Sequence, residues 1–514
     1  MLTVLRALRV FVVDRRWKEG VLVTLVLVVN LSAGSPETVR LVDAVKAGDR
    51  EAVRTLAANR AAVNAPDPDG TTPLHWAVRA DDLDTIQVLL RAGADAKASN
   101  RYGITPLSLA AINGNAKVID LLLKAGADPK SSVSHGQTVL MTAARTGNPA
   151  AVALLIERGA NVNARESQLG ETALMWAAAE NHPEAVRLLV QHGADVNARS
   201  SAPAFPKDRF GLEGVLTILP RGNWTPLMYA AREGATEAAR ALVDLRADID
   251  AVDPDGTTAL VRAIVNAHYD TAGVLIDGGA DPNIADTTGM AALYAAVDMS
   301  SLGEVYGRPA RKVRDKLTAL DVTRMLLMHG AKPNAQLKTP ALQKNHTPGE
   351  GLLGEGTTPL ARAAKHGDFA AMQVLLERGA DATLAQKNHT TVLMLAAGLG
   401  RGLGVFAKDV GTEADLLAAA KLAVEHGVDV NAQNDAGQTA LHFAAQSGLD
   451  SVVRLLATSG AQLDVKDKQG RTPVDVALGV GGRGRAGGPP PVYERTAALI
   501  RQLIAARSAS GGRP

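Results

Sequence analysis

The chain has 514 residues, of which 46% are hydrophobic, 21% are charged and only 3% are aromatic. So few aromatic residues argue against one large core and favour many small repeated cores of Ala, Leu and Val. The 55 basic and 53 acidic residues leave a net charge of +2, which gives no electrostatic signature of nucleic-acid binding. The sequence contains no cysteine, so disulfides, thiol catalysis and thiolate metal sites are excluded.

The segment 1–33 has the pattern of a secretory signal. Two arginines and a lysine within residues 15–18 precede an apolar run over residues 21–29, and small residues follow. This order is typical of a cleaved signal peptide, and we expect cleavage after Ala33. The apolar run is shorter than the roughly 20 residues that a membrane-spanning helix needs. The alternative is a leader that is retained and tethers the protein to a membrane.

One short pattern recurs along the rest of the chain: Gly, any residue, Thr, Pro or a small residue, Leu, and then two alanines. Its threonines are Thr72, Thr105, Thr138, Thr172, Thr225, Thr258, Thr358, Thr391, Thr439 and Thr472, with Ala291 in the equivalent place. Counted along the chain, the successive steps are 33, 33, 34, 53, 33, 33, 67, 33, 48 and 33. A constant period with a few insertions predicts a stack of repeated units.

The residues of one unit predict two short helices and a tip. The hydroxyl of Thr105 can cap a helix, and Pro106 suits the first helical turn. A second helix follows Gly114, with its apolar stripe over residues 118–123. Gly126 is expected to end this helix in a left-handed conformation. Such a unit cannot bury its apolar face alone, so its stability must come from stacking on its neighbours.

These motifs resemble those of the ankyrin-repeat family over residues 36–508. Thr-Pro-Leu-His at residues 72–75 matches the family's most recognisable tetrapeptide, and Thr-Ala-Leu-His at residues 439–442 is a variant of it. The resemblance implies an all-α repeat solenoid of about twelve helix–turn–helix units with hairpin-like tips and helical caps. It also implies that His75 and His442 make hydrogen bonds that tie adjacent tips together.

The two ends of the array depart from the pattern. Residues 36–69 keep the two-helix pattern without the Thr-Pro-Leu signature, and we predict an N-terminal capping repeat there. Regular repeats are expected over residues 70–199 and, with insertions, over residues 222–478. Residues 479–491 are predicted to be a mobile loop rich in Gly, Arg and Pro, and residues 492–508 a C-terminal capping helix.

Four insertions interrupt the period. Residues 200–221 and 336–355 extend the tips, whereas residues 299–311 and 399–411 follow a first helix and extend the opposite ends. Insertions in repeat arrays often belong to binding faces. An equal alternative is that these insertions are extra surface loops that the fold tolerates and that have no function. Arg246 takes the place of a helix-ending glycine, and the sequence leaves open how that unit ends.

The sequence contains no arrangement of residues that indicates catalysis. The histidines lack the HxxxH or HExxH spacing that puts two metal ligands on one helix face. His192, His329 and His426 each precede a helix-ending glycine, where a cation is favoured by the helix dipole. We therefore predict no enzyme activity, no cofactor, no metal, no small-molecule substrate and no nucleic-acid partner. An enzyme whose site is built in the insertions is the weaker alternative.

The residue just before the paired alanines is expected on or beside the concave face, with which ankyrin arrays usually bind proteins. The candidate protein-binding residues at this position are Trp76, Leu109, Trp176, Tyr229, Arg262, Arg362 and Phe443. Interface hot spots favour Trp, Tyr and Arg, and the alternative is that these side chains fill gaps between neighbouring first helices. Tyr102 and Trp224 lie on predicted tips, where we expect better exposure.

The predicted function is a secreted or periplasmic scaffold, monomeric by itself, that binds another protein through its concave face. The alternatives are a membrane-tethered adaptor that retains its N-terminal segment and, less favoured, the enzyme mentioned above.

Overall fold

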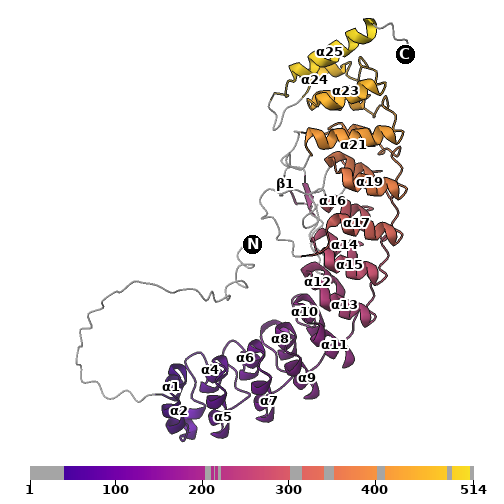
Figure 1. The fold of residues 1–514 in the computed structure, drawn as a ribbon. Coiled ribbons are helices and arrows are strands. Elements are labelled where there is room, and N and C mark those ends of the chain that lie inside the picture. The colour runs from indigo at the N-terminus through magenta and orange to yellow at the C-terminus, as the bar shows by residue number, and fades with distance from the viewer. Residues whose placement is uncertain are drawn as a thin grey trace, which may run out of the picture.

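The computed structural model describes residues 40–202, 210–212, 215–217, 222–300, 315–340, 352–401, 411–482 and 489–509. The predicted leader lies outside these residues, as do most of the insertions predicted at 299–311 and 399–411. The described chain forms helices that pair in sequence order and stack into one curved row (Figure 1). This arrangement confirms the predicted α-helical solenoid.

Each unit contributes a first and a second helix. The first helices are α1 (Leu41–Ala47), α4 (Pro73–Arg79), α6 (Pro106–Asn113), α8 (Val139–Thr146), α10 (Ala173–Ala179), α12 (Pro226–Glu233), α14 (Ala259–Val265), α16 (Ala292–Ser300), α18 (Pro359–His366), α20 (Val392–Ala396), α22 (Ala440–Gln446) and α24 (Pro473–Ala477). The second helices are α2 (Arg50–Leu56), α5 (Leu83–Arg91), α7 (Ala116–Lys124), α9 (Pro149–Glu157), α11 (Pro183–Gln191), α13 (Thr236–Asp244), α15 (Tyr269–Asp277), α17 (Ala319–Met328), α19 (Phe369–Glu377), α21 (Glu413–Glu425), α23 (Asp450–Thr458) and α25 (Glu494–Ala509).

Short elements complete the described chain. They are α3 (Arg60–Val63), the 3-10 helix η1 (Ser134–Gly136) and the strands β1 (Phe210–Leu212) and β2 (Val215–Thr217). The two strands pair antiparallel inside the insertion predicted at 200–221, so this insertion contains a small hairpin that the sequence did not predict.

The two helices of a unit lie on opposite sides of the curve. Figure 1 places α4, α6, α8, α10 and α12 on the inner side and α5, α7, α9, α11 and α13 on the outer side. The first helices therefore form the inner, concave face, and β1 lies toward that same side.

The first helices begin where the sequence predicted. The ten threonines of the repeated pattern are all N-cap residues. At α6, for example, the backbone N–H of Ser108 donates to Thr105 Oγ1 at 3.1 Å, and Pro106 is the first helical residue. This satisfies a backbone donor that would otherwise lack a partner, which is why threonine recurs here.

From α5 to α23, each second helix is followed by a residue in the left-handed conformation. Gly126 has a φ of +92°, as expected. Arg246, at the equivalent place after α13, also has a positive φ, of 64°. This unit therefore ends like the others, although a residue with a Cβ is disfavoured in that conformation by about 1 kcal/mol.

The core is formed between units as much as within them. Leu107, Ala110 and Ala111 of α6 and Ile119 and Leu122 of α7 are all 0–1% exposed. They belong to one continuous cluster that runs from Leu41 to Ile500. Because alanines face alanines on successive first helices, neighbouring units approach closely and share one core.

Asparagines connect the ends of successive second helices. Asn163 Nδ2 donates to the carbonyl of Gly193 at 2.8 Å, and its Oδ1 accepts from the backbone N–H of Asp195 at 2.9 Å. The same pair of bonds is made by Asn64, Asn283, Asn334 and Asn431. One side chain thus fixes the distance between two units, a role that the sequence analysis did not assign.

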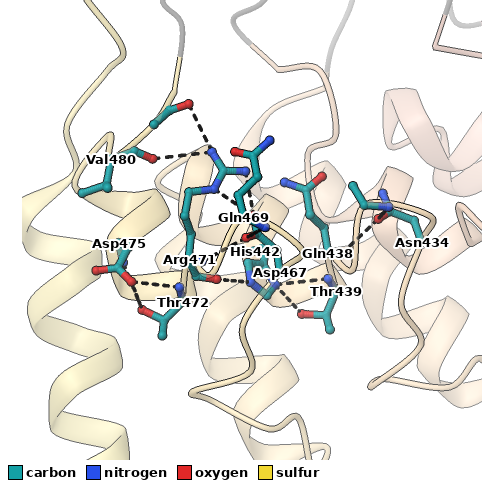
Figure 2. A network of polar contacts seen from close by, with 12 residues as sticks. Asn434, Gln438, Thr439, His442, Asp467, Gln469, Arg471, Thr472, Asp475 and Val480 are labelled. Carbon is teal, nitrogen blue, oxygen red and sulfur yellow. Dashed lines mark hydrogen bonds and ion pairs between the residues drawn. The ribbon is translucent and has the colours of Figure 1, made fainter.

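Buried histidines tie adjacent tips together, as the resemblance implied. The backbone N–H of Thr439 donates to Nδ1 of His442 at 3.1 Å, and Nε2 donates to the carbonyl of Arg471 in the next tip at 3.2 Å (Figure 2). His75 makes the same contacts with Thr72 and with the carbonyl of Ile104. Both imidazoles are therefore neutral, with the proton on Nε2.

Truncation of one core leucine should loosen more than one unit. We expect Leu122→Ala to lower the free energy of unfolding by about 2–5 kcal/mol, because it leaves a cavity in place of a fully buried side chain. Hydrogen exchange should increase in the adjacent repeats as well, since each unit is stabilised by its neighbours. The exposed Met328 offers a control, and Met328→Ala should have little effect. Exchange confined to the mutated unit would contradict the shared core.

The tip histidines should make stability depend on pH. Burial lowers the pKa of His75 and of His442 below the ordinary value, since desolvation disfavours the charged form. The unfolded chain then binds protons that the folded chain does not, so the free energy of unfolding falls as the pH drops below about 6.5.

We expect urea unfolding to show this loss between pH values of about 7.5 and about 5.5. The loss should be smaller in a His75→Gln/His442→Gln double variant, because glutamine keeps a donor and an acceptor without titrating. The same pH dependence in both proteins would mean that the tip histidines do not cause it.

Candidate protein-binding face

The seven predicted contact residues lie on seven first helices, each just before the paired alanines or their equivalent. Trp76 on α4, Leu109 on α6 and Trp176 on α10 are half-buried. The exposed fraction of the other four is 7% for Tyr229, 5% for Arg262, 2% for Phe443 and 1% for Arg362. A partner can therefore reach this position on α4, α6 and α10, whereas the four residues from α12 onward are enclosed by the chain itself.

Trp76 is held by its own tip. Its Nε1 donates to Oδ2 of Asp67 at 3.0 Å, and Nζ of Lys46 lies 2.7 Å from the same oxygen. Lys46 Nζ and the guanidinium of Arg79 also lie 4.7 and 5.3 Å from the centre of the indole ring. The polar edge of the ring is thus satisfied and two cations lie on its face, which fixes the ring before any partner arrives.

One carboxylate holds two rings on the neighbouring helices α10 and α12. Glu171 Oε2 accepts from Nε1 of Trp176 at 2.8 Å, and its Oε1 accepts from the hydroxyl of Tyr229 at 2.7 Å. Burial, together with the negative charge of Glu171, raises the pKa of Tyr229, so this hydroxyl stays protonated and donates. The two rings are therefore positioned as one rigid group.

A shallow cavity of about 200 Å³ lies beside this group. It is lined by Arg145, Glu171, Met175, Trp176, Ala179, Glu180, Tyr229 and Arg232. Arg145 and Arg232 come from α8 and α12, on either side of α10. The cavity is smaller than the roughly 300–1,000 Å³ of small-molecule pockets, so it suits a single side chain of a protein partner.

Trp224 is buried, so the prediction that it is exposed on a tip was wrong. The Arg262 guanidinium lies 4.0 Å from the centre of its ring, and Tyr229 packs edge-on at 5.5 Å. Arg262 itself is paired with Asp253 at 2.5 Å. Burial lowers the pKa of Arg262, while the Asp253 carboxylate opposes this shift. This buried stack joins the units of α12 and α14.

Tyr102, in contrast, is 55% exposed, as predicted.

Arg362 also forms a buried pair that joins units. Its Nε donates to the carboxylate of Asp298 on α16, 64 residues earlier, and its guanidinium contacts the imidazole of His366. Burial, followed by the charge of Arg362, lowers the pKa of His366. Phe443 lies in the common core. Arg362 and Phe443 are thus buried between helices, which agrees with the alternative that these side chains fill gaps in the packing.

Three exposed side chains on the same face were missed. Arg79, Ile112 and Arg145 occur one period apart, in the last turn of α4, α6 and α8. Arg79 and Ile112 each lie three positions after a selected residue, Trp76 and Leu109 respectively, and Arg145 has the equivalent place in the next unit. The constant spacing was visible in the sequence, but the sequence analysis considered only the position just before the paired alanines.

The described residues contain no group of three His, Asp or Glu side chains that could hold a metal ion. His192, His329 and His426 instead donate from Nδ1 to the carbonyl four residues earlier, at 2.8, 2.9 and 2.9 Å. Each of these carbonyls also accepts the backbone N–H of the same histidine, so the imidazole adds a second bond at the helix end. Among the helices in the described ranges, none is long and apolar enough to cross a membrane.

Removal of the shared carboxylate should test the rigid group. Glu171→Ala leaves the donors of Trp176 and Tyr229 without their acceptor, and we expect it to lower the free energy of unfolding by about 1–3 kcal/mol. Glu180, on the same cavity but exposed, is the matched control, and Glu180→Ala should change stability by less than about 0.5 kcal/mol. Equal effects in chemical denaturation would contradict the special role of Glu171.

Comparison with known proteins agrees with this architecture. A family model described as ankyrin repeats (3 copies) matches residues 41–133, 129–200 and 211–286, and one described as ankyrin repeats (many copies) matches residues 424–477.

Among curated proteins, the chain is similar to human Ankyrin repeat and SOCS box protein 16, with 35% identity over 268 residues, 52% of this chain and 50% of that protein. The mouse protein of the same name is 28% identical over 267 residues, again 52% and 50%. The Arabidopsis thaliana E3 ubiquitin-protein ligase KEG is 24% identical over 264 residues, 46% of this chain and 15% of the ligase. The chain thus spans half or less of the length of these relatives.

With the stacked helix pairs and capping threonines, these matches show that the chain belongs to the ankyrin-repeat family.

Proposed function

We propose that this protein is a scaffold that holds a protein partner against the inner face of α4, α6, α8 and α10. Membership of the ankyrin-repeat family supports a role in protein–protein interaction. The observation that carries the finer proposal is the pair of half-buried tryptophans, Trp76 and Trp176, each fixed by a hydrogen bond to a tip carboxylate.

Fixed aromatic side chains are suited to binding. Hot spots of protein interfaces favour Trp, Tyr and Arg, and a side chain that is already ordered loses little entropy when a partner arrives. Trp76 and Trp176 meet both conditions, because their polar edges are satisfied and arginines lie over their faces. Tyr229 contributes indirectly, since it is buried and shares Glu171 with Trp176.

We propose a binding role rather than an enzymatic one. One relative is by name a ubiquitin ligase, but the match covers 15% of its length. The names of two other relatives mention a SOCS box, and their matches cover half of each protein. The proposal rests on the binding face and does not extend the activity of any relative to this chain.

We further propose, from the composition of residues 1–33 alone, that the scaffold is exported to a secreted or periplasmic location. A membrane-tethered protein with a retained leader is the competing proposal. N-terminal sequencing of the mature chain separates the two, because export with cleavage predicts a first residue near Gly34. A mature chain that begins at Met1 would contradict cleavage.

The binding face can be tested by site-specific cross-linking. A photo-reactive amino acid placed at Ile112 or Tyr102 should capture a partner, because Ile112 is on the inner face, Tyr102 is on a tip, and both side chains are exposed. The same amino acid at Arg187 of α11, on the outer face, should not. Capture from the outer position alone would contradict the proposal.

The captured partner then allows a quantitative comparison. Trp76→Ala and Trp176→Ala should each weaken its affinity by about 1–3 kcal/mol, as hot-spot truncations do. Phe443→Ala is the matched aromatic control: its ring is buried, so we expect a loss of stability of about 3–5 kcal/mol and an unchanged affinity of the folded protein. Unchanged affinity in both tryptophan variants would contradict a contact between the partner and these two side chains.

A further inference from the structure

A row of equivalent side chains crosses the first four units. Lys46, Arg79, Ile112 and Arg145 follow one another at the constant period of the repeat, in the last turns of α1, α4, α6 and α8. Figure 1 shows the last three of these helices next to one another on the inner side of the curve. Ile112 is 57% exposed, and the side chain of Arg145 is 54% exposed. The row therefore presents an apolar side chain between two arginines.

The two arginines have unused hydrogen-bonding capacity. Arg79 and Arg145 lie 5.3 and 5.7 Å from the ring centres of Trp76 and Trp176, an arrangement that leaves the N–H edge of a guanidinium accessible. Within the described ranges, neither guanidinium has a hydrogen bond to another side chain. The nearest carboxylate oxygen to Arg145 belongs to Glu180, and its 3.9 Å separation from Nε is too long for a hydrogen bond.

The carboxylates beside these rings are, in contrast, fully engaged. Both oxygens of Asp67 and both oxygens of Glu171 accept from side chains of the chain itself. The N–H groups of Arg79 and Arg145 thus remain available on this face, beside the exposed carboxylate of Glu180. A partner must supply acceptors, and carboxylates pair with arginine most strongly.

We propose that the row of Arg79, Ile112 and Arg145 binds an extended acidic segment of a partner protein, a conclusion that rests on the proposed binding function. One carboxylate pairs with each arginine, and an apolar side chain between the two carboxylates packs on Ile112. Packed helices lie about 8–10 Å apart, so α4 and α8 are separated by roughly 16–20 Å. An extended chain rises about 3.3 Å per residue and its alternate side chains share a face, which places the two acidic residues about six positions apart.

The test uses the full chain and a labelled peptide, Glu-Ser-Leu-Ser-Leu-Ser-Glu, in a fluorescence anisotropy titration, since alternate residues of an extended chain lie on the same face. We expect the Arg79→Gln/Arg145→Gln variant to bind this peptide at least about tenfold more weakly, because bidentate pairs are lost. The matched control, Arg187→Gln/Arg240→Gln, removes the same charge from the outer helices α11 and α13 and should stay within about twofold of the wild type. Ile112→Ser should weaken binding by a smaller factor.

The outcomes are distinct. Binding that falls equally in both double variants, or that is equal for a peptide with glutamine at both ends, would overturn the proposal. So would no detectable binding to the wild type. An RNA oligonucleotide that competes with the peptide and is lost in the Arg79→Gln/Arg145→Gln variant would identify a nucleic-acid site instead.

The cross-linked partner separates this proposal from the proposed function. If Trp176→Ala weakens the binding of this partner and the Arg79→Gln/Arg145→Gln variant does not, the proposed function is supported and the proposal of an acidic segment is contradicted. If neither changes its affinity, both fail. Circular dichroism of each variant verifies that the solenoid is intact.

Discussion

The stacking of one unit on the next is the interaction on which the rest of the structure depends. A pair of short helices such as α6 and α7 cannot shield Leu107 or Leu122 from water alone, and both become fully buried only between neighbours. The alanines that permit this close approach leave no room for large side chains on that surface. Trp76 and Trp176 lie instead at the inner edge of their first helices, where they remain half-exposed.

Tip carboxylates show how the same local geometry serves two purposes. Asp67 accepts from Trp76, and Asp253 accepts from Arg262, in both cases nine residues later. In the first case the ring stays half-exposed on the inner face, whereas in the second the guanidinium is buried against Trp224. The contact therefore orients a side chain without deciding its role. Whether it binds a partner or joins two units depends on what covers it.

That dependence explains which parts could be predicted from the sequence. The capping threonines and the helix-ending glycines follow from local rules, because their effects are decided within a few residues, and the role of the tip histidines was implied by the family resemblance. The burial of Trp224, Arg262 and Arg362 does not, because it depends on contacts such as that between Arg362 and Asp298, 64 residues apart across an insertion. The asparagine links between units were not predicted, because these residues lie outside the repeated pattern from which the units were derived.

The open part of the candidate face lies within the first uninterrupted stretch of the array. From Thr72 to Thr172 the motif recurs at an almost constant step, and there Trp76, Leu109 and Trp176 remain accessible. Beyond Thr172 longer steps interrupt the period, and the equivalent residues Tyr229, Arg262, Arg362 and Phe443 are buried. An extended partner needs contacts at a constant spacing, which only uninterrupted units provide. The same regularity that builds the core thus sets the register in which Arg79, Ile112 and Arg145 would meet an acidic segment.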